Sequence, residues 1–185
     1  WGPWNRAVAF SPAVSITRIM HTRCLVFLFC IALAGCALGD PHGEEVGAWP
    51  EGPLDEASGL VYAKALGLFI SHNDDTDRHV YFLDRDYRER GRLEIEEARN
   101  RDWEDLALIE REDRAPILVI GDVGDNSGRY PFVRLHYVAL VPKESLRPDP
   151  PVDYRYLGYQ KCTYPDGPRD CESIAYDPVN HRILL

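Results

Sequence analysis

The sequence contains one six-residue pattern three times: EASGLV at residues 56–61, DWEDLA at 102–107 and DCESIA at 170–175. Each copy has an acid first, Glu or Ser third, and Leu or Ile fifth, and a small or branched apolar residue follows. A motif that recurs along a chain is typical of repeat architectures, in which each copy marks one supersecondary unit. We call it the repeat motif and expect a structural unit to begin at each copy.

Short runs of Val, Ile, Leu, Phe and Tyr, separated by turn residues, follow each motif and predict β-strands. The first unit is predicted to hold strands at 59–63, 68–72, 79–84 and 92–95, and the second at 106–110, 117–121, 133–141 and 154–159. A third unit begins with strands at 173–177 and 182–185. Residues 88–101 are the one segment that could be helical, but Gly91 and the sparse apolar positions argue against it.

Four strands per unit predict an all-β fold, a partial β-propeller with two four-stranded blades and the start of a third. A β-sandwich also has many short strands, but it would not carry the same motif three times. Propellers close with about four to eight blades, and the sequence ends inside the apolar run 183–185. We therefore expect the domain at residues 54–185 to be truncated at the C-terminus. The wider gap before the third motif is assigned to an insert at residues 142–151.

Acidic residues are predicted to gather at one end of these units. In an antiparallel hairpin, residues entering the first strand and residues leaving the second strand lie at the same end. The candidate metal ligands are Glu56, Asp102, Glu104, Asp170 and Glu172 from the motifs, and Asp74, Asp122, Asp125 and Asn126 after second strands. Hard oxygen ligands of this kind suit Ca²⁺, and crowded carboxylates repel one another unless a cation joins them.

A purely structural use of the same residues is the alternative. Asp and Asn at strand ends commonly accept hydrogen bonds from turn amides. His72 is interpreted as structural, and Trp103 as a wedge between blades. The sequence has no EF-hand spacing, zinc motif, Ser-His-Asp order or phosphate-binding loop.

The amino end has the features of a targeting segment. Cys24–Gly35 is an uncharged apolar run, shorter than the roughly 20 residues that span a membrane, and Arg18 and Arg23 precede it. The run ends in Leu33-Ala-Gly-Cys36, which resembles the lipobox of bacterial lipoproteins. That resemblance implies export, lipidation of Cys36 and anchoring in the cell envelope, on the periplasmic side of the outer membrane if the host has one. Simple secretion or a buried strand are the alternatives.

The expected division of the chain follows from this segment. Met20 is the one methionine, so residues 1–19 are interpreted as an upstream extension and 20–35 as the lipoprotein signal peptide. Residues 36–53 are rich in Gly, Pro and Glu and predict a tether. In an oxidising compartment Cys162 and Cys171 are expected to form a disulfide, with two free thiols as the alternative.

The formal net charge of −9 argues against nucleic acid as a partner, because phosphates would repel such a surface. A membrane contact is expected through the lipid anchor alone, together with a ligand or protein partner of unknown kind.

The motifs and the segments HND at 72–74, GDVGDN at 121–126 and YPDGPRDCE at 164–172 resemble a group of exported bacterial propeller proteins. That group is distantly similar to phytase-like and calcium-dependent esterase-like propellers. The resemblance implies a possible Ca²⁺ cofactor, with loop arginines Arg78, Arg101, Arg129 and Arg169 as candidate anion contacts. Two hypotheses follow: a ligand- or partner-binding module with an acidic rim, which we favour, and a calcium-dependent hydrolase of esters or phosphoesters.

Overall fold

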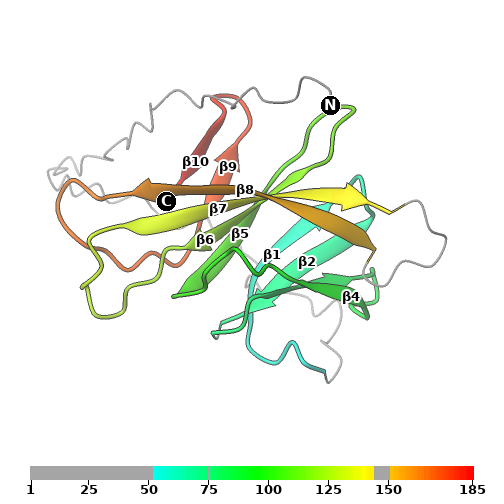
Figure 1. Cartoon of the computed structure of the whole chain (residues 1–185), viewed down its shortest axis with the longest axis horizontal. Helices are drawn as coiled ribbons and strands as arrows, with labels where there is room; N and C mark the ends of the chain where they lie inside the picture. Colours follow the sequence, from blue (N-terminus) through cyan, green and yellow to red (C-terminus); the bar gives the residue numbers. More distant parts are fainter. Residues whose placement is uncertain (1–51, 75, 144–150) are drawn as a thin grey trace, which may run out of the picture. The chain divides into compact units, whose positions relative to one another are not determined.

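All regular structure in the described part of the chain is antiparallel β-sheet, as predicted (Figure 1). The computed structural model describes residues 52–74, 76–143 and 151–185. Within these ranges no helix is long and apolar enough to cross a lipid bilayer. The expected extension, signal peptide, lipidated Cys36 and most of the tether lie outside the described residues, as do residues 144–150 of the expected insert.

Two sheets of four strands and one of two strands follow one another along the chain. The first has the order β1-β2-β3-β4, with bounds Ala57–Ala63, Leu68–Asn73, His79–Leu83 and Glu89–Glu94. The second has the order β5-β6-β7-β8, with bounds Trp103–Ile109, Ile117–Asp122, Val133–Pro142 and Val152–Cys162. The third pairs β9 (Ala175–Asp177) with β10 (Arg182–Leu184). Each predicted strand is present, and residues 88–101 contain β4 and turns instead of a helix.

The first two repeat motifs lie largely inside the first strands, because β1 begins at Ala57 and β5 at Trp103, earlier than the predicted starts at residues 59 and 106. The β1–β2 ladder shifts register between Ser58 and Leu60, and the β5–β6 ladder shifts between Trp103 and Asp105. Such an extra residue is a β-bulge, which keeps the motif paired while bending the strand. Gly59 occupies the first bulge at φ 62°, and a Cβ there would lie 2.9 Å from the Leu106 amide nitrogen. A glycine is therefore required where the first two motifs meet.

The alternation of side chains along β5 explains how the sheets pack. Leu106 and Leu108 pack in the hydrophobic cluster that contains Ile70 and Phe82 of the first sheet. Ala107 packs in a second cluster, which contains Ile174 and reaches the third sheet. Because neighbouring residues of a strand point to opposite faces, the second sheet has one apolar face against each neighbouring sheet. Burying one such large side chain contributes about 1.5–3 kcal/mol.

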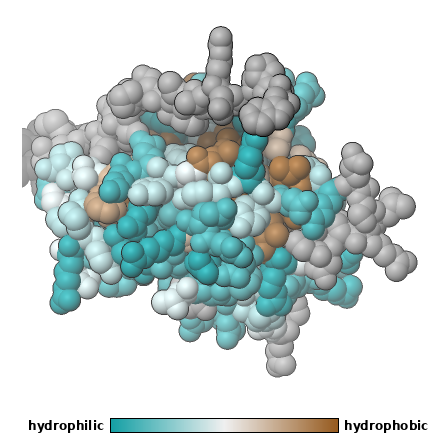
Figure 2. All heavy atoms as spheres, viewed as in Figure 1, coloured by the Kyte–Doolittle hydropathy of each residue, from teal (hydrophilic) through white to brown (hydrophobic). Residues whose placement is uncertain are grey.

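The first strands of the three units are neighbours in space, β1 beside β5 and β5 beside β9. The described residues thus form a stack of three sheets whose motifs lie next to one another. The sheets are open and do not close on themselves. The outer surface seen in Figure 2 is largely hydrophilic, with smaller apolar areas.

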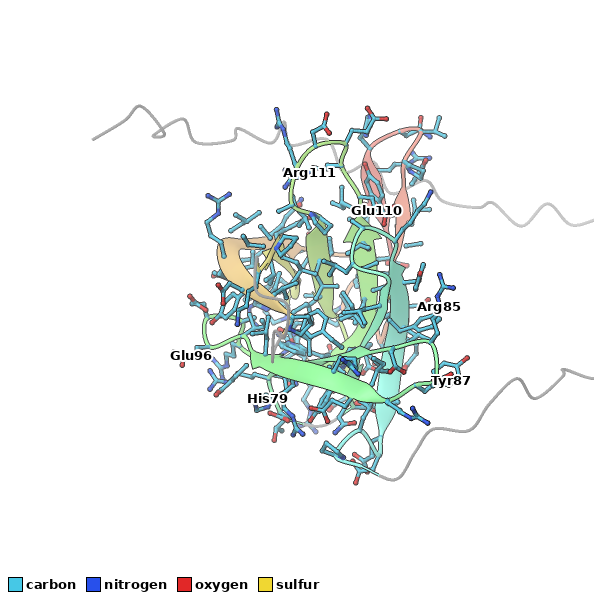
Figure 3. All side chains as sticks on the ribbon, turned by 90° about the vertical axis from the view of Figure 1, so that its right-hand side faces the viewer. His79, Arg85, Tyr87, Glu96, Glu110 and Arg111 are labelled. Carbon is cyan, nitrogen blue, oxygen red and sulfur yellow. The ribbon has the colours of Figure 1, made fainter. Side chains whose placement is uncertain are left out.

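The hairpin ends away from the motifs are ordinary turns, as the sequence predicted. In the turn after β1, the Gly67 amide donates to the Ala63 carbonyl at 2.8 Å. The loop after β5 contains Glu110 and Arg111, which lie together at one end of the molecule in Figure 3. The Glu110 carboxylate accepts a 2.8 Å hydrogen bond from the Lys64 amide, which ties the first two sheets together at this end.

Candidate metal centre

Five carboxylates from all three units come together at the motif end of the sheets. Asp74, Asp102 and Glu104 form one group, and Glu104, Asp170 and Glu172 form another. Within each group, one oxygen of each residue lies within 4.8 Å of the others. We call these five residues the acidic rim cluster. Asp74 follows β2, Asp102 and Glu104 stand at the start of β5, and Asp170 and Glu172 precede β9. The packing of the three sheets therefore brings them together.

Backbone hydrogen bonds hold the first two motifs at this end in equivalent ways. The buried Asp122 carboxylate accepts hydrogen bonds from the amides of Arg101 and Asp102, at 3.0 and 2.8 Å. Asn73 occupies the equivalent place at the end of β2, and its side-chain oxygen accepts from the Glu56 amide at 3.3 Å. The last residue of each second strand therefore fixes the acid that begins the motif.

Glu104 lies at the centre of the cluster and is nearly buried, with 6% of its surface exposed. The Ser58 hydroxyl donates a 2.7 Å hydrogen bond to the backbone carbonyl of Glu104. Gly124 approaches its side chain so closely that a Cβ there would lie under 3.0 Å from Glu104 Oε1 and Asp102 Oδ2. A side chain at residue 124 would therefore force the ends of both carboxylate side chains to shift.

Electrostatic repulsion is strong within the cluster. Burial, followed by the charges of Glu172, Asp74 and Asp102 and a hydrogen bond with Glu172, raises the pKa of Glu104 to about 7. Burial and the neighbouring carboxylates also raise the pKa of Asp102. Among the described residues, no Lys, Arg or His forms an ion pair with any of the five. The charge of Arg101 lowers the pKa of Asp102 without forming an ion pair, so the negative charge of the cluster is only partly compensated.

The third motif is attached to the second unit by two hydrogen bonds. The Asp125 amide donates to Asp170 Oδ1 at 2.7 Å, and Asp105 Oδ2 accepts from the Ile174 amide at 2.8 Å. These bonds hold the segment with Asp170 and Glu172 against β5. Sequence reasoning missed the roles of Asp105, Ser58 and Asn73, although the first two stand inside the repeat motif and could have been tested as contacts between units.

Four predicted ligands lie outside the acidic rim cluster. Glu56 and Asn126 are exposed. Asp122 is committed to backbone amides and to an ion pair with Arg134 at 2.8 Å. Asp125 accepts hydrogen bonds from the amides of residues 129 and 130, which lower its pKa, so it closes its own loop.

The four candidate anion-binding arginines do not converge. Arg78 pairs with Glu94 and Arg169 pairs with Asp166. Arg101 lies over the Tyr130 ring at 3.6 Å, and its charge lowers the pKa of Asp102 against the larger raising effects. Arg129 is exposed and contributes its backbone amide to the Asp125 loop.

His72 and Trp103 have structural contacts. His72 Nδ1 lies 2.8 Å from the Asn73 carbonyl, and its ring packs edge-on against Trp103. Trp103 is fully buried in the cluster between the first two sheets, which agrees with its interpretation as a wedge. Cys162 and Cys171 are both free thiols in the structure, so the expected disulfide is not formed there.

The donor set fits a hard divalent cation. Carboxylate oxygens are the ligands of Ca²⁺, which takes six to eight oxygens and accepts irregular geometry. The five carboxylates of the acidic rim cluster supply such oxygens from three units, and Glu104 is the buried one at the centre. Gly124, which has no side chain, leaves space beside it.

Comparisons of the chain with protein-family models, with curated proteins and with solved structures gave no match. The interpretation of this site therefore depends on the residues themselves.

Proposed function

We propose that the described sheets are consecutive blades of a β-propeller and that the acidic rim cluster binds a divalent cation, with Ca²⁺ the expected ion. In this proposal the protein is an exported, lipid-anchored module that binds a ligand or partner at this rim. The observation that carries it is the pair of carboxylate groups that share the buried Glu104 and form no ion pair with a basic side chain among the described residues.

The repeated use of one sheet face supports the propeller. Leu106 and Ile174, both at the fifth motif position, pack toward the preceding sheet and are 3% and 6% exposed. Leu60 holds this position in the first sheet, yet it is 50% exposed, and Tyr62 beside it is 38% exposed. In a closed ring the last blade would cover this face of the first blade.

A cation would relieve the strain that the electrostatics impose. Near neutral pH, ionising Glu104 adds charge beside Glu172, Asp74 and Asp102 in a partly desolvated place. A divalent ion replaces this repulsion with attraction and keeps all the carboxylates ionised. Exposed Asp74, Asp170 and Glu172 leave an open side, where water or a ligand group could complete the coordination.

A calcium-dependent hydrolase is the second candidate, and the open side of the acidic rim cluster favours it. Asp74, Asp170 and Glu172 are exposed, so a substrate could reach a cation held there. A bound metal would supply polarisation of the scissile group. The dispersed arginines weigh against a phosphate-rich substrate, so we prefer the binding module.

The envelope location rests on the sequence alone. The apolar run before Cys36 and the lipobox resemblance support export and lipidation, and the acidic composition makes nucleic acid an unsuitable partner. Replacing Cys36 with Ser in the full-length protein should prevent incorporation of labelled palmitate and release the protein from the membrane fraction. Unchanged labelling would overturn this part of the proposal.

Calorimetric titration of the full-length protein with CaCl₂ and with MgCl₂ tests the cation site. We expect saturable Ca²⁺ binding that Asp102→Asn and Glu104→Gln abolish or weaken by at least about 10-fold, since each removes a charged ligand. Glu112→Gln makes the same charge change in the exposed loop after β5 and should bind like the wild type. Equal binding by all four proteins, or none, would overturn the proposal. Calcium-dependent turnover of a generic phosphoester would favour the hydrolase.

A further inference from the structure

Cys171 stands between two residues of the acidic rim cluster, Asp170 and Glu172. This segment precedes β9 and has no strand pairing of its own. Apart from the two hydrogen bonds to the second unit, it depends on the packing of Cys171 and Ile174 for its position. Any change at Cys171 therefore acts directly on two of the five carboxylates.

Cys162 lies at the last position of β8 and packs in the same apolar cluster as Cys171. A turn between them, closed by the Gly167 amide and the Tyr164 carbonyl at 3.3 Å, reverses the chain. The Tyr164 side chain packs in the same cluster as both thiols, and burial, followed by the neighbouring sulfurs of Cys171 and Cys162, raises its pKa. The two cysteines thus share one half-buried environment on either side of a reversal.

We propose that Cys162 and Cys171 form a redox-controlled disulfide that holds the third motif against the second sheet and thereby sets the cation affinity of the acidic rim cluster. The inference rests on the proposed cation site and adds its regulation. Position 162 is fixed by the ladder of β7 and β8, where it pairs with Val133. A covalent bond to this strand end would fix the backbone of residues 170–172, from which Asp170 and Glu172 project. With free thiols, only weaker non-covalent contacts hold that backbone in place.

The oxidant is a small-molecule or protein disulfide of the compartment. The Cys171 thiolate attacks it, forming a mixed disulfide and releasing one thiol. Burial raises the pKa of the Cys162 thiol, which disfavours its thiolate and hence a first attack by Cys162. The Cys162 thiolate then attacks the Cys171 sulfur and expels the second thiol. Two protein thiols and one external disulfide become one protein disulfide and two external thiols. The Cys171 thiol, which donates to the Ser173 carbonyl at 3.2 Å, gives up that contact.

The test uses the full-length protein, oxidised with glutathione disulfide or reduced with a phosphine. Peptide mass mapping should find a 162–171 linkage in the oxidised sample alone. Ca²⁺ titration should then show about 10-fold tighter binding by the oxidised protein, in line with the effect of groups that position metal ligands. The variant Cys162→Ser should have the lower affinity in both conditions, which separates this pair from the other cysteines.

Each outcome has a distinct meaning. Absence of the 162–171 linkage after oxidation overturns the disulfide. A linkage with equal Ca²⁺ affinity in both states overturns the regulation and leaves the cation site intact. A linkage without Ca²⁺ binding in either state overturns the proposed function, and with it the regulatory role, while the disulfide itself stands.

Discussion

The Ser58 hydroxyl donates a 2.7 Å hydrogen bond to the backbone carbonyl of Glu104, and the two residues hold the same third position in successive repeat motifs. The bond joins the bulged part of β1 to that of β5, where Gly59 also lets the two backbones meet. A contact between equivalent positions is what a stack of like units produces. It also fixes the backbone of Glu104, whose carboxylate belongs to the acidic rim cluster.

Replacing Ser58 with Ala should lower the free energy of unfolding by about 1 kcal/mol, because a largely buried hydrogen bond between sheets is lost. Urea unfolding monitored by tryptophan fluorescence measures this change. Ser127→Ala, in the exposed part of the loop after β6, should stay within about 0.5 kcal/mol of the wild type. Equal effects would show that the inter-sheet bond has no energetic role.

Replacing Gly124 with Ala should weaken Ca²⁺ binding by about 10-fold or more, since the added Cβ would displace Glu104 Oε1 and Asp102 Oδ2 from their positions. Gly128→Ala is the matched control. Residue 128 has open space around it but φ of 61°, so the substitution should cost about 1 kcal/mol of stability through backbone strain alone. Titration calorimetry and thermal melting separate the two effects. An unchanged Ca²⁺ affinity in Gly124→Ala would place the site elsewhere.

Glu104 should make stability depend on pH in the presence of a chelator. The pKa of Glu104 is about 7 in the folded protein, above the ordinary value of 4.5 that applies to the unfolded chain. Protonation of Glu104 therefore favours the folded state. This contribution is fully present below about pH 4.5 and is lost as the pH rises through about 7. Melting temperatures of Glu104→Gln should lack this component between pH 5 and pH 8, taken as roughly bracketing that window. Glu112→Gln should keep it, and a parallel loss in both variants would contradict the assignment.

Leu106 and Leu60 have the same motif position but different surroundings. Leu106→Ala should destabilise the protein by about 2–5 kcal/mol, because it opens a cavity between the first and second sheets. Leu60→Ala should cost less than about 1 kcal/mol, because half of this side chain is already exposed. Chemical denaturation of both variants gives the comparison. A similar large cost for Leu60→Ala would mean that another sheet covers this face in the protein studied.

The sequence predicted the strands because their chemistry is local. Alternating apolar residues, Gly and Pro turns and the repeat motif identified all ten strands of the described residues, with ends displaced by a few residues. The displacement is largest at the start of β4, the start of β5 and the end of β8. A bulge allows motif residues to pair inside a strand, and a ladder such as β7–β8 extends as far as its partner allows. Neither the position of a bulge nor the length of a ladder depends on the residue types of one segment alone.

The sequence by itself determined that acids from several units gather at one end, because hairpin connectivity fixes which strand ends coincide. Only the tertiary structure decided which acids face one another. Asp122 and Asp102 both belong to that end, yet Asp122 is turned to amides and Arg134, while Asp102 faces Glu104. The difference arises because the register of β5 on β6 and the contact between neighbouring sheets orient each side chain, and both are set by residues far away along the chain.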